Sequence, residues 1–480
     1  MENVINFNFI SKSKLNSIRK VLQVASILLL FSMLVFASVT NYSVVFLIFS
    51  ILILQVCVFL DIEDVFCLYI MLTPFNVVFN AGVYSSIYAV FIALIFLILL
   101  AKYVYRILHK EIKCSYLVFA LMAVYFIYCC LPIFGKNIST QIFTIFLNLL
   151  YTFLIYENRD KISLKKFTFC FCASLMLSGL LSFFLKYLDV AIALKNSGEI
   201  PNRDNIPKLK GFYAHPNIYS EVIIFSLSLL FYLKYHKKIL PATFYCLFAP
   251  LFVLGYLTVS RAFIIEIIVL VVIYFIFEII RDKKIPYKEL ALIFAIIIAV
   301  VLILFKITGF YIMRFRDKYE FELLPFEQIP KDTTALILDC KQKYDAGRLN
   351  LYKLYIYFFI HNPVQLFFGR GCGSPYLGQT HSHNFLIDAV YLNGLVGVIL
   401  YSLIIFKIFN LKKMKQYLNL KRLSFLIILV SFCALQFLNT YFSPLFLTFL
   451  IIAFYDKSIF EDISETKYQT TLNELQEEKA

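Results

Sequence analysis

The chain has 480 residues, of which 61% are hydrophobic and only 16% are charged. Soluble globular domains are about 45–50% apolar and about 25% charged, so this composition excludes an ordinary soluble domain. Basic cytoplasmic loops of a membrane protein account for the formal net charge of +15, and nucleic acid is not predicted as a partner.

Apolar runs of about 17–23 residues recur along the chain, and this length suits helices that cross a bilayer. The first run lacks a small-residue cleavage site, so it is predicted to be a span and not a signal peptide. About fourteen spans are predicted, with twelve or thirteen as alternatives because three runs are short or weak: 21–39, 43–60, 65–80, 85–101, 115–134, 141–156, 167–188, 216–233, 239–257, 262–280, 289–309, 383–406, 423–438 and 440–455.

These runs predict an all-α integral membrane protein with about 12–14 transmembrane helices. Residues 21–455 are predicted to form one polytopic transmembrane domain, between a cytoplasmic N-terminus at 1–20 and a cytoplasmic tail at 456–480. No separate soluble domain and no internal repeat is recognisable in the sequence.

Lysine and arginine alternate between the short loops in a way that predicts the orientation of the chain. Cytoplasmic loops carry an excess of these residues. They are frequent in 102–113, 157–166, 234–238, 281–288 and 407–422, whereas the intervening short loops hold one lysine, Lys136, and one arginine, Arg261. This pattern predicts that both termini are cytoplasmic and that the two long loops, 189–215 and 310–382, are extracytoplasmic.

Scarce polar residues gather in the second long loop and at the helix that follows it. Of 14 glycines and 6 histidines in the chain, five glycines and three histidines lie between Gly347 and His383. Arginine suits phosphate because its planar fork is always charged, and histidine can accept a proton near neutral pH. A lipid diphosphate needs cationic partners as charge develops on it. No sequence motif for a metal or a cofactor is present, so neither is predicted.

Simpler roles remain open for several of these residues. An arginine at a helix end can extend to lipid headgroups, and His383 or His381 can have a structural role at the start of the next helix. Proline disfavours a helical conformation in the residue before it, so His361-Asn362-Pro363 also predicts a helix stop.

Four segments, in order over about residues 205–455, resemble the O-antigen polymerase and O-antigen ligase superfamily (the Wzy and WaaL types). They are the Gly211-Phe212-Tyr213-Ala214-His215-Pro216-Asn217 entry into a span, the Thr258-Val259-Ser260-Arg261-Ala262 motif, Gly347-Arg348 with His361-Asn362-Pro363 and Gly369-Arg370-Gly371, and His383-Asn384 with Asn393-Gly394-Leu395-Val396-Gly397.

The resemblance implies an inverting, metal-independent transferase of glycosyltransferase C-like architecture, with a donor glycan on undecaprenyl diphosphate. Arg261 and Arg348 would engage the diphosphate, and His383 would be the base for the acceptor hydroxyl. Further substrate-binding candidates are His215, Asn217, Arg370 and Asn384. The charged stretch 314–343 lengthens the external loop relative to the family pattern.

Asn384 and Asp388 are four residues apart and share a helix face. An acid in a span should face protein or water and have a polar partner. We therefore expect both residues to hold the start of this helix, while His383 points to the acceptor hydroxyl.

The predicted function is polymerisation of undecaprenyl-diphosphate-linked repeat units into a surface polysaccharide, O-antigen or capsule, at the outer face of the bacterial inner membrane. A ligase, a transporter of lipid-linked glycan and a structural or sensory membrane protein are the alternatives. Broken helices near the membrane centre and internal repeats, which mark many transporters, are not recognised in the sequence. Membrane lipids and a chain-length regulator protein are further candidate partners. The external Cys340 and Cys372 are a candidate disulfide pair.

Overall fold

The computed structural model describes residues 12–39, 42–75, 85–131, 140–188, 209–213, 216–258, 260–282, 288, 291–295, 298–299, 348–371, 377, 384–409, 427–429 and 444–456. In these residues the regular elements are helices and no strand occurs, which confirms the all-α prediction. Cys340 and Cys372 lie outside them, and their pairing stays a prediction.

Six helices in the described part of the chain are long and apolar enough to cross a membrane. They are Lys20–Ala37, Ser85–Leu108, Leu164–Phe184, Pro216–Tyr235, Ala262–Arg281 and Leu386–Phe409. Each has 18 residues or more, and a helix needs about 20 apolar residues to span the hydrocarbon core. The chain is therefore a multi-pass membrane protein.

The chain forms two compact units. Unit 1 comprises residues 1–113, 161–226 and 250–258, and unit 2 comprises 114–160, 227–249 and 259–480. Two helices, α10 (Pro216–Tyr235) and α11 (Pro241–Leu257), contribute to both units. The prediction of one polytopic domain over 21–455 is not tested by this division.

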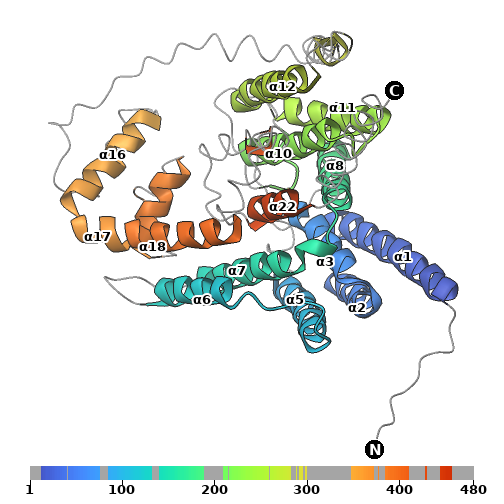
Figure 1. Cartoon of the computed structure of the whole chain (residues 1–480). Helices are drawn as coiled ribbons and strands as arrows, with labels where there is room; N and C mark the ends of the chain where they lie inside the picture. Colours follow the sequence, from blue (N-terminus) through green and yellow to red (C-terminus); the bar gives the residue numbers. More distant parts are fainter. Residues whose placement is uncertain are drawn as a thin grey trace, which may run out of the picture. The chain divides into compact units, whose positions relative to one another are not determined.

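Unit 1 is built on α1 (Lys12–Val39), α2 (Ser43–Phe59), α3 (Ile62–Leu72), α5 (Ser85–Leu108) and α8 (Leu164–Leu188) (Figure 1). The helix α3 packs against α8, and α2 packs against both α1 and α5. The described part of the predicted span 65–80 is short, because α3 has 11 residues and passes into the 3-10 turn Thr73–Phe75.

Charged side chains in unit 1 are held in a connected network. Lys166 of α8 forms ion pairs with Glu63, at 3.1 Å, and with Asp64 of α3. The Asp64 carboxylate also accepts a hydrogen bond of 2.8 Å from Gln23 of α1. Buried charges are tolerated when they are paired and hydrogen-bonded, so this network ties three helices together.

Unit 2 contains α6 (Tyr116–Cys130), α7 (Thr140–Asn158), α12 (Arg261–Asp282), α16 (Arg348–His361), α17 (Pro363–Phe368), α18 (Phe385–Phe409) and α22 (Pro444–Tyr455). The helix α6 packs against α7 and α18, and α22 packs against α7. The short α17 lies along α18, which α16 also contacts. This group of helices carries the region in which the sequence concentrates its glycines and histidines.

Twelve of the predicted spans coincide with a helix in the described residues, and their boundaries differ by up to nine residues. The predicted spans 289–309 and 423–438 lie mostly outside the described residues. The total number of spans therefore stays a prediction.

Candidate functional site

The boundary between α16 and α17 is set by His361-Asn362-Pro363. Proline has no backbone N–H and restricts the residue before it, so α16 ends at His361 and α17 begins at Pro363. The Asn362 side chain donates a hydrogen bond of 2.9 Å to the Phe358 carbonyl, and the exposed His361 ring lies 4.0 Å from the Tyr357 ring. The predicted helix stop is confirmed.

Two glycines bring α17 and α18 into backbone contact. Gly369 follows α17 with φ 72°, and Gly394 interrupts α18 with φ 68° and ψ 174°. Residues other than glycine rarely adopt a backbone conformation with such a positive φ. A Cβ atom at Gly369 would overlap the Leu392 carbonyl oxygen, and one at Gly394 would overlap the Phe367 carbonyl oxygen. Only glycine therefore fits at each of these positions. We call the close approach of Gly369 and Gly394 the glycine contact.

The interruption at Gly394 removes hydrogen bonds that a continuous helix would give its own carbonyl groups, and other segments replace them. The amides of Arg370 and Gly371 donate to the carbonyls of Tyr391, at 2.9 Å, and Leu392, at 2.8 Å. In a bilayer every backbone polar group needs such a partner. We call these carbonyls, together with that of Asn393, the capped break.

Tyr128 of α6 completes the capped break. Its hydroxyl lies 2.6 Å from the Asn393 carbonyl oxygen and 2.9 Å from that of Phe368, so one proton is shared between the two helices. The α6 helix can approach because Gly397 has no side chain, since a Cβ there would lie 2.9 Å from the Tyr128 ring.

The predicted span 383–406 is therefore corrected in its interior. Its apolar sequence predicts a continuous helix, and no broken helix is recognised there, but α18 changes direction at Gly394 (Figure 1). The reason is tertiary, because the contacts that stabilise the interruption come from α6 and from the loop after α17.

Arg370 is held at its side chain as well as at its backbone. Its Nη1 atom donates a hydrogen bond of 3.0 Å to the Tyr391 hydroxyl. Its Cζ atom lies 5.8 Å from the ring centroids of both Phe358 and Tyr391, within the range of a cation–π interaction. Arg370 is half-buried, and Tyr391 is completely buried.

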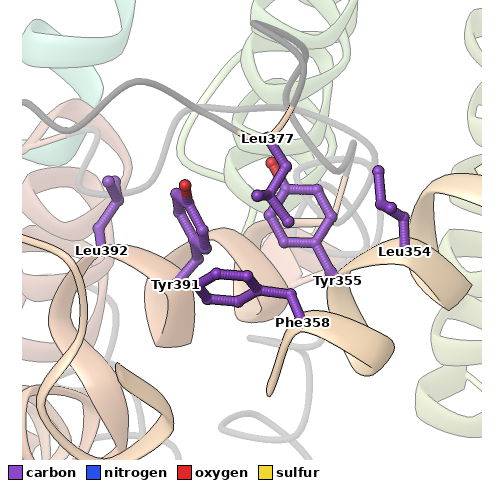
Figure 2. Packing of buried hydrophobic residues seen from close by; sticks show 6 residues of the cluster. All are labelled: Leu354, Tyr355, Phe358, Leu377, Tyr391 and Leu392. Atoms are coloured by element: carbon purple, nitrogen blue, oxygen red, sulfur yellow. The ribbon is translucent and has the colours of Figure 1, made fainter. Parts of the chain in front are cut away.

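A buried hydrophobic cluster with three aromatic residues holds Tyr391, the partner of Arg370, in place. Figure 2 shows its six residues: Leu354, Tyr355 and Phe358 of α16, Tyr391 and Leu392 of α18, and Leu377 between the two helices. The Tyr391 ring packs edge-to-face on Tyr355, with centroids 5.2 Å apart, and on Phe358, at 5.5 Å. Such pairs add about 0.5–1.5 kcal/mol each beyond the burial of their area, so α16 is fixed on α18.

Asn384 caps the start of α18. Its Oδ1 atom accepts hydrogen bonds from the amides of Leu386, at 3.0 Å, and Ile387, at 3.3 Å. These amides would otherwise lack partners within the helix. Asp388, one turn further on, is completely buried, as expected for an acid that faces protein. The expectation that Asn384 holds this helix start is supported, whereas the same role for Asp388 stays a prediction.

Arg261 and Arg348 each occupy the first position of a helix, α12 and α16 respectively. Ser260, directly before α12, is buried. Asn217 is the second residue of α10, and its carbonyl accepts a hydrogen bond of 2.8 Å from the Ser220 hydroxyl. The predicted site residues His215 and His383, and also His381, lie outside the described residues. Their roles remain proposals.

The aromatic residues before α10 pack against other residues of unit 1. Gly211 has φ 55° and packs against the Tyr219 ring. The Phe212 ring lies 5.1 Å from that of Phe75. Burial, with a smaller effect of Tyr219, raises the pKa of the Tyr213 phenol well above its usual value.

Sequence reasoning missed Tyr128 and Tyr391. Each is a tyrosine in an apolar run, and the only signal is that a buried hydroxyl needs a partner. The described residues contain no group of three or more His, Cys, Asp or Glu side chains that could hold a metal ion. A metal-independent reaction stays a prediction.

Residues 246–402 match a family model described as O-antigen ligase. No curated protein and no solved structure was found to match the chain. The matched region runs from α11 into α18 and contains the glycine contact, Arg370 and Asn384. Members of the family are membrane enzymes that act on lipid-linked glycans. Over residues 246–402 the chain is thus similar to the O-antigen polymerase and ligase superfamily.

Proposed function

We propose that this protein polymerises glycan repeat units carried on undecaprenyl diphosphate, at the extracytoplasmic face of the bacterial inner membrane. The observation that carries the proposal is the family match over residues 246–402, within which the glycines, Arg261, Arg348 and Arg370 fall. The product would be a surface polysaccharide such as O-antigen or capsule.

The positions of Arg261 and Arg348 support the binding of an anion. Both open a helix, where amide groups without intrahelical partners and the helix dipole favour negative charge. A cation at this end gains nothing from the dipole, so helix stability does not explain these arginines. A diphosphate would gain from the amides and from the guanidinium groups together.

The proposed reaction is one inverting displacement. The acceptor hydroxyl oxygen attacks the anomeric carbon of the donor sugar while the bond from that carbon to the diphosphate oxygen breaks. The electron pair leaves with the lipid diphosphate, whose developing charge Arg261 and Arg348 stabilise. His383 takes the hydroxyl proton. Asn384, the next residue, fixes the start of α18 and so limits where His383 lies.

The orientation of the site rests on the charge of the short loops. Lys and Arg concentrate in 102–113, 157–166 and 407–422, and such loops are cytoplasmic. This charge pattern supports an outer position for loop 310–382, where the lipid-linked donor and the growing acceptor would meet. It also places both termini in the cytoplasm.

A ligase is the second candidate, because the matching family model is described as O-antigen ligase. A ligase would move finished glycan to a lipid acceptor. We favour a polymerase because the charged stretch 314–343 lengthens the external loop, and each polymerase must fit its own repeat unit.

A transporter is less well supported, although α18 is interrupted. Transporters use the exposed carbonyls of broken helices to bind ions. Here the carbonyls of Tyr391, Leu392 and Asn393 accept hydrogen bonds from the protein itself. The interruption in α18 is therefore better explained as a structural contact between helices than as an ion-binding site.

Purified protein in lipid nanodiscs tests the proposal directly. The substrate is the lipid-linked repeat unit isolated from a strain that lacks this protein, without nucleotide. A ladder of polymers from this substrate alone supports a polymerase. Product that appears only with an added lipid acceptor supports a ligase. Unchanged donor under both conditions contradicts glycan transfer.

A further inference from the structure

Arg370 is bonded to one residue of α18 through both its backbone and its side chain. Its amide donates to the Tyr391 carbonyl at 2.9 Å, and its Nη1 atom donates to the Tyr391 hydroxyl at 3.0 Å. The next amide, of Gly371, donates to the Leu392 carbonyl at 2.8 Å. Two points on the same arginine are thereby fixed relative to the same helical turn.

Tyr391 is a rigid support for this contact. Its side chain is completely buried, and the rings of Tyr355 and Phe358 pack against it at 5.2 and 5.5 Å. The turn that carries it ends at the capped break, where Tyr128 bonds the Asn393 carbonyl. The Tyr391 ring is therefore held by the core, and its backbone is held by the capped break.

The hydroxyl contact restricts the orientation of the guanidinium group. Recognition of a phosphate by arginine depends on that orientation, because two parallel N–H groups must face two oxygen atoms. A hydrogen bond to one edge, together with the Phe358 ring 5.8 Å from Cζ, restricts rotation of the whole side chain. Ordering before binding lowers the entropy cost of binding.

We infer that Tyr391 is a positioning residue for Arg370, and that through this hydroxyl contact it orients the guanidinium group toward the diphosphate of the lipid-linked donor. The inference rests on the proposed function, because it takes a lipid diphosphate as the ligand. It adds a residue that does not itself touch the donor.

The test uses Tyr391→Phe, which removes the hydroxyl and keeps the packed ring. We expect a KM for the donor about 5- to 10-fold higher, the size expected for losing one ordinary hydrogen bond, with a smaller change in kcat. Tyr355→Phe is the matched control, since it makes the same change in the neighbouring buried ring, and its KM should stay within about twofold of wild type. An unchanged KM in Tyr391→Phe overturns the inference.

A double-mutant cycle separates positioning from general loosening of the core. If Tyr391 acts through Arg370, the pair Arg370→Lys and Tyr391→Phe should bind donor no more weakly than Arg370→Lys alone. Losses that multiply in the double variant would overturn the inference. The unfolding midpoint of each variant in detergent confirms that the comparison is made on folded protein.

The probe for binding is undecaprenyl diphosphate without sugar, in nanodiscs. Wild-type protein that does not bind this probe contradicts the proposed function. Wild-type protein that binds it, with Tyr391→Phe binding equally well, leaves the proposed function intact and overturns the positioning role alone. Weaker binding by Tyr391→Phe, with Tyr355→Phe unchanged, supports both.

Discussion

Single residues at helix starts carry much of the proposed chemistry. Arg348 opens α16, whose later residues Tyr355 and Phe358 pack on α18. The first residue of α16 precedes Tyr355 by about 10 Å along the helix axis, at 1.5 Å per residue. The helix that carries Arg348 is therefore held on α18 by the buried aromatic contacts of its later residues.

The charge and the shape of Arg348 can be separated by Arg348→Lys. Lysine keeps the charge but loses the planar fork, so we expect at least about a tenfold loss of polymerisation if the residue grips a diphosphate. Polymer length on gels, normalised to protein abundance, measures it. Polymer of full length at normal abundance would reject the binding role. Arg261→Lys is the parallel experiment on α12.

His383 is predicted to act on the acceptor and not on the donor. In His383→Ala, transfer should slow by about 10²–10⁴-fold, the usual contribution of a general base, while donor binding stays near wild type. His381→Ala, two residues away, is the control and should be much milder. Transfer at the wild-type rate would remove the base assignment, and lost donor binding would move His383 to the diphosphate site.

At the scale of elements, the glycine contact decides how α17 and α18 meet. In Gly394→Ala, a methyl group would overlap the Phe367 carbonyl oxygen, and the backbone would stay in a conformation that alanine disfavours. We expect a loss of stability of about 2 kcal/mol or more. Tyr128→Phe, which removes one shared hydrogen bond, should cost about 1 kcal/mol.

The control for both variants is Ile399→Ala, because that side chain on α18 is 58% exposed and should leave stability near wild type. Thermal unfolding in detergent compares the three. If Gly394→Ala and Ile399→Ala had the same midpoint of thermal unfolding, the expected strain from a methyl group at position 394 would be contradicted.

Hydropathy predicted the helices but not the joint between them. Long apolar runs report their own length, so spans such as 85–101 and 167–188 could be recognised from sequence, and proline marked the end of α16 at His361. A continuous helix is predicted over Asn393-Gly394-Leu395-Val396-Gly397. The break within it depends on partners that are distant in the sequence, so the local sequence does not indicate it. Tyr128, 265 residues before Asn393, gives no local signal of that contact.

At the scale of the whole molecule, loop charge predicts which face each loop occupies. Single cysteines introduced in 311–380 should react with a membrane-impermeant thiol reagent in intact cells, and cysteines in 407–422 should react only after permeabilisation, because the second loop is basic. The background is a variant without the native cysteines that retains polymerisation. Protection of 311–380 in intact cells would put the donor site on the wrong face.

The contact between Tyr391 and Arg370 also predicts how the affinity for the donor depends on salt concentration. Tyr391, which holds Arg370, lies six residues after Phe385, or about 9 Å into the helix at 1.5 Å per residue. Mobile ions screen charges in solution over about 8 Å at physiological ionic strength, but they screen buried charges much less. A donor held partly by the half-buried Arg370 should therefore lose less affinity as the salt concentration rises than a donor held only by surface lysines.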